Sequence, residues 1–313
     1  MNLFPAPPHF RTPACFLALF LMVGATQVCF GWGMDGHKII NRVAVQTLPA
    51  NLPAFLRTPR SLDEMVYLGP EADRWRSAAE PELSAAQAPN HFIDLELADM
   101  AAPNGLPRRR YDFFRDLAEA RREHPTIAYK LTPQRVGLLP WQADEVFERL
   151  RGDMRDYRRM SAAHKDLYGV EQAILYDVGW LGHYAGDGSQ PLHTTIDYNG
   201  WVERSNPEHF TRSRGVHSQF ETEFVHDNIR ASDVRPLIPA APRVLKQPFR
   251  DFVAYLRTTH ACVPEVYRLY QQGGFSGHGS AQSRAFTSAR LAAGAAMLRD
   301  MVYTAWVQSA DNS

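Results

Sequence analysis

The segment 170–187 limits most strongly what this chain can fold into. Its apolar residues recur at helical spacing, which predicts a helix with a strongly apolar face that must be buried. His183 and Asp187 lie four residues apart in this segment, so both side chains share one helix face. A glycine and a proline just beyond it predict a helix end and a turn that brings His193 back toward the pair.

Other segments share this helical spacing, and no convincing alternating or β-branched run indicates a strand. The stretches between them are rich in Pro, Gly, Asn or Ser and are predicted as loops. With 313 residues and 45% hydrophobic content, the chain can bury a large core. We therefore expect an all-α fold, a single compact multi-helix domain. The expected helices cover 33–48, 133–160 with a break near Pro140, 216–229, 249–270 and 280–307, and the expected loops are 69–90, 100–109 and 194–215.

The first 31 residues have the layout of a secretory signal. Arg11 precedes an apolar run at 14–28, and small residues stand at the positions before a cleavage point after Gly31. The run is shorter than the roughly 20 residues that a membrane-spanning helix needs, and an uncleaved anchor is the alternative. We expect cleavage to make Trp32 the mature N-terminus of a secreted or periplasmic protein.

The mature chain, 32–313, has few cysteines and no excess of charge. Cys15 and Cys29 lie in the expected signal, so Cys262 alone remains and no internal disulfide can form. Stability must then come from the core or from bound metal, and a zinc site must use histidine and carboxylate ligands. The full sequence has 34 basic and 34 acidic residues, and removal of Arg11 with the signal hardly changes this balance, so the composition does not indicate the strongly basic surface of a duplex DNA-binding protein.

Histidines and carboxylates recur in other parts of the chain. His217 and Glu221 repeat the spacing of four within an amphipathic segment, and His37, Asp73 and His91 lie upstream. Each of them alone also fits a structural role: a helix or turn cap, a buried hydrogen-bonded histidine, or part of a solvated face. Taken together, such a group of histidines and carboxylates is typical of a zinc site.

The order of these residues resembles that of a known family. The pattern W-G-x-x-G-H opens the mature chain, D-x-x-R begins at Asp73, and H-F-I-D begins at His91. H-x3-D-x5-H, ending in Q-P-L-H, begins at His183, and H-x3-E begins at His217. This succession, over about residues 32–230, is similar to the single-strand-specific zinc nucleases of fungi and plants, which share a superfamily with bacterial zinc-dependent phospholipases C.

The resemblance implies an all-α fold that encloses three zinc ions in a cleft. The implied ligands are Asp73, His91, His183 and Asp187 for the first ion, His193, His217 and Glu221 for the second, and the α-amine and carbonyl of Trp32, His37 and a second oxygen of Asp187 for the third. Asp187 would then bridge two ions. The α-amine can act as a ligand only when cleavage before Trp32 frees it.

The resemblance also implies the hydrolysis of a phosphodiester. Zinc lowers the pKa of a bound water and neutralises phosphate charge, and Asp73 would orient that water or accept its proton. Arg76 matches the arginine that stabilises charge developing on phosphate; an ordinary surface arginine is the alternative. Phe92 matches the position that stacks a nucleobase, which suits single strands because their base faces are free; core packing is its alternative.

Two departures from the nuclease pattern leave the substrate open. Glu221 stands where the nucleases usually have aspartate, and glutamate is the phospholipase-like choice. The segment 194–215 differs from the nuclease loop and carries Tyr198 and Trp201. Three roles are open for these two residues: stacking a base, forming part of a cage for a choline-like head group, or anchoring the loop.

Three functions therefore remain after the sequence analysis. The first is a secreted zinc endonuclease acting on single-stranded DNA or RNA, with 3′-nucleotidase activity as a possible addition; Phe92 and the spacing from Asp73 to Arg76 favour it. The second is a phospholipase C acting on lipid head groups, which Glu221 favours. The third is a zinc-stabilised binding protein without turnover, and the full ligand set argues against it. None of the three implies a stable protein partner.

Overall fold

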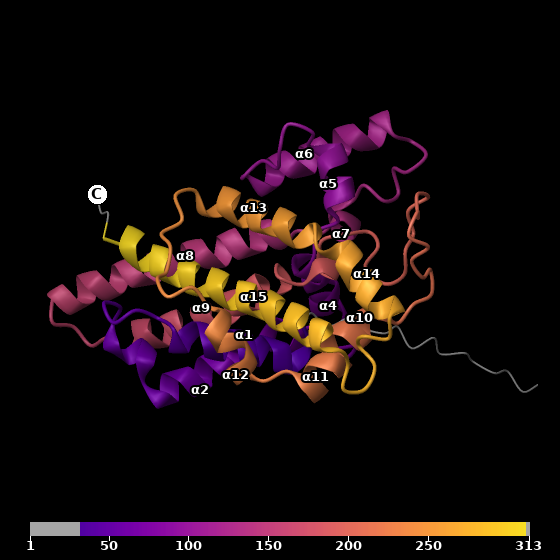
Figure 1. The fold of residues 1–313 in the computed structure, drawn as a ribbon. Coiled ribbons are helices and arrows are strands. Elements are labelled where there is room, and N and C mark those ends of the chain that lie inside the picture. Colours follow the sequence, from indigo (N-terminus) through magenta and orange to yellow (C-terminus); the bar gives the residue numbers. More distant parts are fainter. Residues whose placement is uncertain (1–31, 311–313) are drawn as a thin grey trace, which may run out of the picture.

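Helix α9 (Tyr168–Asp187) forms the centre of the structure, and other helices pack around it (Figure 1). The computed structural model describes residues 32–310, and the regular structure within them is helical. Two isolated bridges are the only β pairing in this range. The all-α prediction is therefore confirmed for the described part of the chain. The predicted signal, 1–31, lies outside the described residues.

The remaining helices and short helical turns follow one another along the described chain. They are α1 (Gly33–Gln46), η1 (Ala54–Arg57), α2 (Pro59–Leu68), α3 (Glu71–Arg74), α4 (Pro81–Gln87), η2 (Ala88–His91), α5 (Leu95–Ala101), α6 (Arg110–Glu123), α7 (Pro133–Val136), α8 (Leu139–Ala162), η3 (Pro191–His193), α10 (Val216–Ser218), η4 (Gln219–Glu223), α11 (Phe224–Asn228), α12 (Ala231–Val234), η5 (Arg235–Leu237), α13 (Pro248–His260), α14 (Val263–Gln271) and α15 (Ala281–Gln308).

The helices α1, α2, α8 and α15 cover α9. In Figure 1, α15 runs along the length of the helical body, while α5 and α6 stand out on one side. Ile174, Leu175, Val178 and Leu181 of α9 are buried, as their helical spacing predicts. The last two turns of α9, residues 181–187, are buried all round, so the polar residues at its C-terminal end lie inside the protein.

Two glycines of α9 allow α1 to approach closely. A Cβ on Gly182 would lie 1.9 Å from Asn41 Oδ1, and a Cβ on Gly186 would lie 2.9 Å from His37 Nδ1. The Asn41 amide donates hydrogen bonds to backbone carbonyls of both α2 and α9. The close approach of these backbones brings His37 beside the polar end of α9.

Prolines explain several differences from the predicted helices. The helix predicted over 249–270 is broken into α13 and α14, because Pro264 has no N–H and its ring would clash with the carbonyl of His260 in a continuous helix. The break predicted near Pro140 is confirmed and falls just before it, since a proline fits the first turn of a helix. The predicted loop 69–90 was partly wrong, as it contains the short helices α3 and α4.

Within residues 32–310, no helix has the length and apolar character needed to cross a bilayer. The apolar side chains instead form one core to which most helices contribute. Cys262, a free thiol, lies at the break between α13 and α14.

Candidate metal centre

Eight ionisable side chains from six segments of the chain meet in one buried cluster. Each has an exposed fraction of 4% or less. They come from α1, α3, η2, α9, η3 and the adjoining turns α10 and η4. Burying such groups away from water is costly unless they are paired or bind an ion. The cluster consists of His37, Asp73, His91, His183, Asp187, His193, His217 and Glu221.

Asp187 lies at the centre of this cluster, and its two oxygens face different histidines. Oδ2 lies 3.1 Å from His183 Nε2 and 3.2 Å from His91 Nδ1. Oδ1 lies 3.5 Å from His37 Nε2 and 3.4 Å from His193 Nδ1. A carboxylate with one oxygen directed to each of two ligand groups has the placement that a bridging ligand needs.

His37 and Asp73 complete one side of the cluster. The His37 ring stacks on His183, with 4.0 Å between ring centroids. Asp73 lies 3.8 Å from His37 through Oδ2, and through Oδ1 it lies 3.6 Å from His91 and 3.8 Å from His183. Two triads on this side have ligand atoms within 4.8 Å of one another and can hold metal ions: His37 with Asp73 and His183, and His91 with His183 and Asp187.

His193, His217 and Glu221 form the other side, and their ligand atoms also lie within 4.8 Å of one another. Glu221 Oε2 lies 2.8 Å from His217 Nε2 and 3.6 Å from His193 Nε2. Glu221 lies within η4, a single π-helical turn inside the helix predicted over 216–229. Such turns occur frequently at functional sites. The structure thus brings together the three residues that the sequence analysis grouped as one ligand set.

Backbone carbonyls orient three of the histidine rings. The Nδ1 atoms of His183, His193 and His217 donate to the carbonyl oxygens of Gly69, His91 and Tyr198, over 2.9, 2.7 and 3.0 Å. A carbonyl oxygen only accepts, so Nδ1 carries a proton in each ring and Nε2 faces the cluster. His193 Nε2 and His217 Nε2 are 3.2 Å apart. Two ring nitrogens at this distance need a proton or a cation between them.

The protein environment keeps two of the rings neutral. Burial lowers the pKa of His91 to about 3 and holds the pKa of His37 well below its usual value. Burial opposes charge on His183 as well, but Asp187 and Asp73 outweigh it and raise the pKa of that ring to about 9. Neutral imidazole is the form that binds metal, so His37 and His91 are ready to act as ligands near neutral pH.

The three carboxylates differ in how readily they carry charge. Burial opposes charge on Asp187 and Glu221, but the adjoining histidines outweigh it and lower the pKa of both groups. Burial raises the pKa of Asp73 to about 7; Asp187 adds to this rise, whereas His183 and the positive charge of Arg76 oppose it. The cluster therefore holds at least two buried negative charges, which favours the binding of cations.

Several atoms of the cluster find no hydrogen-bond partner among the described residues. They are both ring nitrogens of His37, Nε2 of His91 and all four carboxylate oxygens of Asp73 and Asp187. Buried polar atoms in native proteins are nearly always satisfied. Histidine nitrogens and carboxylate oxygens are also the ligands from which metal sites without cysteine are built. The residues present therefore fit bound metal ions.

Trp32 lies against the segment that carries Asp187. Its indole N–H donates to Gly186 O over 2.9 Å and to Ser189 Oγ over 2.7 Å, and its ring packs edge-on against Phe220. The side chain is fully buried. These contacts hold the first described residue beside the end of α9, next to the cluster that its α-amine is predicted to join.

Arg76 and Phe92 both adjoin the cluster. The positive charge of Arg76 is close enough to contribute to the pKa shifts of Asp73 and His91, although burial is the main cause of each. Phe92 follows His91 directly, where the chain becomes extended, and its side chain is partly exposed. Neither position contradicts the predicted roles at phosphate and base.

Tyr198 and Trp201 have different surroundings. Tyr198 is 47% exposed, and its ring centroid lies 6.1 Å from that of His217, so it borders the cluster on the solvent side. Trp201 packs against Phe210 and Tyr267, and its indole N–H donates to a backbone carbonyl of its own loop. The contacts of Trp201 agree with the loop-anchor alternative, whereas Tyr198 remains available to a ligand.

Gln190 belongs to the site but was not predicted from the sequence. This fully buried side chain donates to Glu221 Oε2 over 2.8 Å, lies 3.2 Å from His217 Nε2 and accepts from Leu192 N over 2.7 Å. Its amide thus orients Glu221 while capping the turn that carries His193. The only signal in the sequence was its place in the Q-P-L-H pattern, which names no function for the glutamine.

We expect Gln190→Ala to weaken metal binding at His193, His217 and Glu221 by about 10- to 100-fold, because outer partners of ligands have effects of this size. Competition with a chromogenic chelator measures this affinity. Gln219→Ala is the matched control, since Gln219 lies in the π-helical turn that carries Glu221 but its amide bonds to Ser276. Equal affinities in both variants would contradict the role of Gln190.

Comparisons with known proteins leave the family open. No family model matches the chain. A protein of Bradyrhizobium tropiciagri described as a "Probable serine protease" is 26% identical to this chain over 193 residues. The match covers 54% of this chain but 23% of that protein, so the chain spans less than a quarter of its relative's length.

Proposed function

We propose that this chain is a secreted or periplasmic zinc-dependent phosphodiesterase that hydrolyses single-stranded DNA or RNA. The observation that carries the proposal is the placement of Asp187, with one oxygen directed to His183 and His91 and the other to His37 and His193. This division matches the bridging role that the nuclease resemblance implies. The resemblance further suggests activity on the 3′-phosphates of nucleotides.

The proposed ligand sets use the whole cluster. Asp73, His91, His183 and Asp187 would hold the first zinc, His193, His217 and Glu221 the second, and His37, Asp187 and the freed amine and carbonyl of Trp32 the third. Zinc in these sites would supply a water of lowered pKa and positive charge to neutralise a phosphate.

The side chains around the cluster would orient substrate and proton. Asp73, which lies in the first ligand set near the positive charge of Arg76, would orient the attacking water or accept its proton. Arg76 would stabilise the charge that develops on the phosphate. Phe92 and Tyr198, both accessible to solvent, would stack an unpaired base. Such stacking is available to the bases of a single strand, whereas the bases of a duplex are already stacked on one another.

A phospholipase C acting on lipid head groups is the second candidate. Glu221 favours it, as the phospholipase-like acid in the last ligand pair. The 47% exposed Tyr198 ring beside His217 would also suit a choline-like cation. A zinc-stabilised binding protein without turnover is the third candidate, and the proximity of Asp73 and Arg76 to the cluster argues against it.

The relative described as a serine protease supports hydrolysis in general rather than a serine mechanism in this chain. A serine nucleophile needs a histidine within hydrogen-bond reach. Among residues 32–310, no serine hydroxyl is hydrogen-bonded to a histidine, and the buried Ser189 instead accepts from Trp32 and donates to Gly186. The match also leaves most of the relative's own length unaccounted for.

A side-by-side substrate assay tests the proposal. The chain expressed with its native N-terminus and loaded with zinc is incubated with single-stranded DNA, RNA, duplex DNA and phosphatidylcholine vesicles. We expect hydrolysis of the single strands and much slower cleavage of the duplex. Hydrolysis of the lipid alone would establish the phospholipase instead, and no turnover with zinc bound would establish the binding protein.

A further inference from the structure

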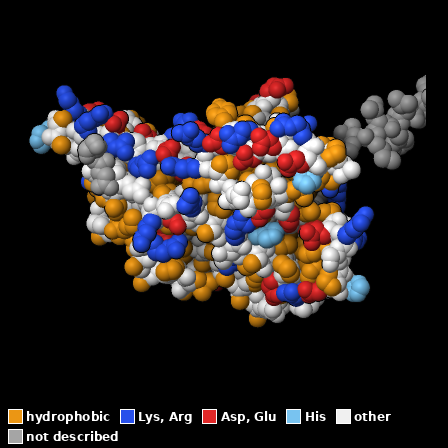
Figure 2. Space-filling model, turned by 90° about the horizontal axis from the view of Figure 1, so that it is seen from above, with side chains coloured by type: hydrophobic (Ala, Val, Ile, Leu, Met, Phe, Trp, Pro, Cys, Tyr) orange, Lys and Arg blue, Asp and Glu red, His pale blue; other side chains and the backbone are white. Residues whose placement is uncertain are grey.

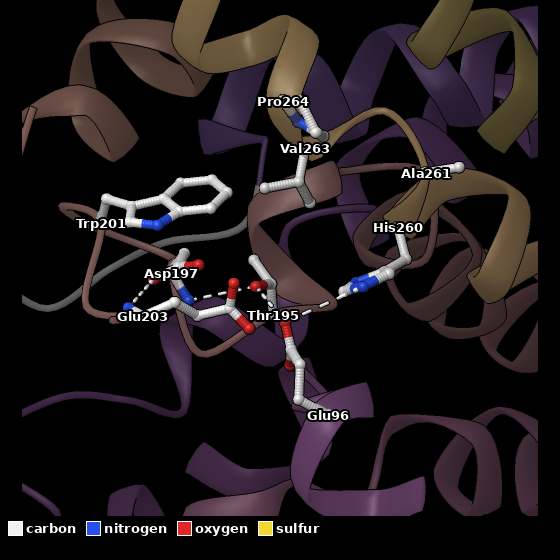
Figure 3. A pocket seen from close by; sticks show the side chains of 9 residues that line it. All are labelled: Glu96, Thr195, Asp197, Trp201, Glu203, His260, Ala261, Val263 and Pro264. Atoms are coloured by element: carbon white, nitrogen blue, oxygen red, sulfur yellow. Dashed lines mark hydrogen bonds and ion pairs between the residues drawn. The ribbon is translucent and has the colours of Figure 1, made fainter. Parts of the chain in front are cut away.

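A second polar site lies outside the metal cluster, in a cavity of about 210 Å³ beside α13 and α14 (Figure 3). The segment that follows His193 forms its floor, and Thr195 and Asp197 line it. His260 closes one side, with its Nδ1 donating to the Thr194 carbonyl over 2.9 Å. The cavity therefore neighbours the metal cluster in the chain but is formed by different side chains.

Three carboxylates, of Glu96, Asp197 and Glu203, line this cavity. Glu96 accepts from the Thr195 hydroxyl and the Ile196 amide, so hydrogen bonds within the chain occupy it. Glu203 reaches toward the same space from the loop, and no described group donates a hydrogen bond to its carboxylate (Figure 3).

Asp197 is the most deeply buried of these three carboxylates. The residue is 2% exposed, and its Oδ1 accepts from the backbone amides of Val202 and Glu203. Its Oδ2 receives no hydrogen bond from any residue in 32–310, although the side chain lines the cavity. This oxygen is not completely enclosed by the protein, so a group that enters the cavity can reach it. Its natural partner is a donor that enters the cavity.

The charge around Asp197 is not balanced by the protein. Burial raises the pKa of Glu203, and the charges of Asp197 and Glu96 add to the rise. Burial also raises the pKa of nearby Asp94 to about 8, with the same two carboxylates contributing. Arg212 and His260 partly offset the negative charge of Asp197 and Glu203, but the Arg212 guanidinium donates its hydrogen bonds to backbone carbonyls rather than to these acids. The cavity thus attracts a cation.

The walls of the cavity favour an organic cation with N–H groups. The Trp201 ring and Val263 supply an aromatic and an apolar surface, which suit carbon atoms and a positive charge over the ring. The polar atoms that the protein leaves free are acceptors, Asp197 Oδ2 and the Glu203 carboxylate, whereas His260 Nε2 lies 3.8 Å from Glu96 Oε1. Acceptors of this kind pair with N–H donors, which a quaternary ammonium lacks.

We propose that this cavity binds a small molecule carrying a protonated primary amine, with Asp197 and Glu203 as its acceptors. The volume of about 210 Å³ lies below the roughly 300–1,000 Å³ of pockets for drug-sized ligands, so the ligand has few heavy atoms. The amine packs its carbon chain against Trp201. This site does not depend on the proposed phosphodiesterase activity or on bound zinc.

Calorimetric titration of the full chain with n-butylamine tests the site, with ethanolamine, tetramethylammonium and calcium as comparison ligands. We expect one butylamine per chain, in zinc-loaded and metal-free protein alike, and weaker binding of tetramethylammonium and calcium. Asp197→Asn keeps an acceptor for the loop amides but removes the charge, so we expect binding to weaken about tenfold or more. Glu203→Gln weakens it less, and Glu82→Gln, at an exposed position on α4, leaves it unchanged.

Four results would each overturn this proposal. They are the absence of saturable butylamine binding up to about 10 mM, tighter binding of tetramethylammonium or calcium than of butylamine, binding that needs zinc, and equal affinity in Asp197→Asn, Glu203→Gln and the parent. Because the readout is binding rather than turnover, failure here leaves the phosphodiesterase proposal intact, and the reverse also holds.

Discussion

Asp187→Asn is expected to lower kcat/KM on single-stranded DNA by about a thousandfold or more, which corresponds to about 4 kcal/mol of transition-state stabilisation. The substitution keeps the size of the side chain but removes the charge that faces four histidines at 3.1–3.5 Å. Since this carboxylate is placed to serve two ligand groups, its loss weakens both. Steady-state kinetics and the zinc content of the purified variant measure the effect.

Asp177→Asn is the matched control for this experiment. It makes the same change ten residues earlier on α9, in a buried carboxyl that pairs with Asp153 rather than with the cluster. We expect it to retain both activity and zinc. Full zinc content together with activity within about tenfold of the parent in Asp187→Asn would contradict the central role of Asp187.

Removal of metal is expected to lower the melting temperature by about 10 °C or more. Without cations, the buried acceptors of the cluster face one another, and both oxygens of Asp73 and Asp187 lack partners. A ligand held at a thousand times its Kd stabilises a protein by about 4 kcal/mol, and each kcal/mol shifts the melting temperature of a large domain by roughly 2–4 °C. Thermal unfolding with and without a zinc chelator measures the shift.

The controls for this measurement are simple. Chelator already saturated with zinc should change nothing, and stoichiometric zinc added after chelation should restore the original transition. A melting temperature that stays within about 2 °C after complete removal of metal, a shift worth roughly 1 kcal/mol or less, would show that the cluster is stable as an ion-pair network. That result would contradict the inference that the unpartnered atoms of the cluster bind metal ions.

The helical class and the pair at the end of α9 were predictable because both depend on local spacing. The pair His183 and Asp187 shares a helix face whatever the fold, and the apolar surroundings in 170–187 direct that face inward. The face seen in Figure 2 mixes acidic, basic and apolar side chains, in keeping with the equal numbers of basic and acidic residues in the sequence. The full membership of the cluster required the resemblance, since spacing cannot relate His37 to Asp73.

Other features depend on tertiary contacts and have no local signal. The cavity at Asp197 forms only when the loop 194–215 meets α13 and α14. These two helices were predicted as one helix over 249–270, which Pro264 breaks. Gln190 is an unremarkable polar residue until Glu221 is placed beside it. The π-helical turn around Glu221 likewise arises from packing, because no residue in 219–223 requires it by propensity.

The zinc content of the chain beginning at Trp32 tests the account most directly. Inductively coupled plasma mass spectrometry, with native mass spectrometry for intact stoichiometry, should find three zinc ions per chain. A variant that keeps extra residues before Trp32 should hold two, because its first amine is then an amide and no longer a ligand. Fewer than two zinc ions in the chain that begins at Trp32 would contradict the proposed metal centre.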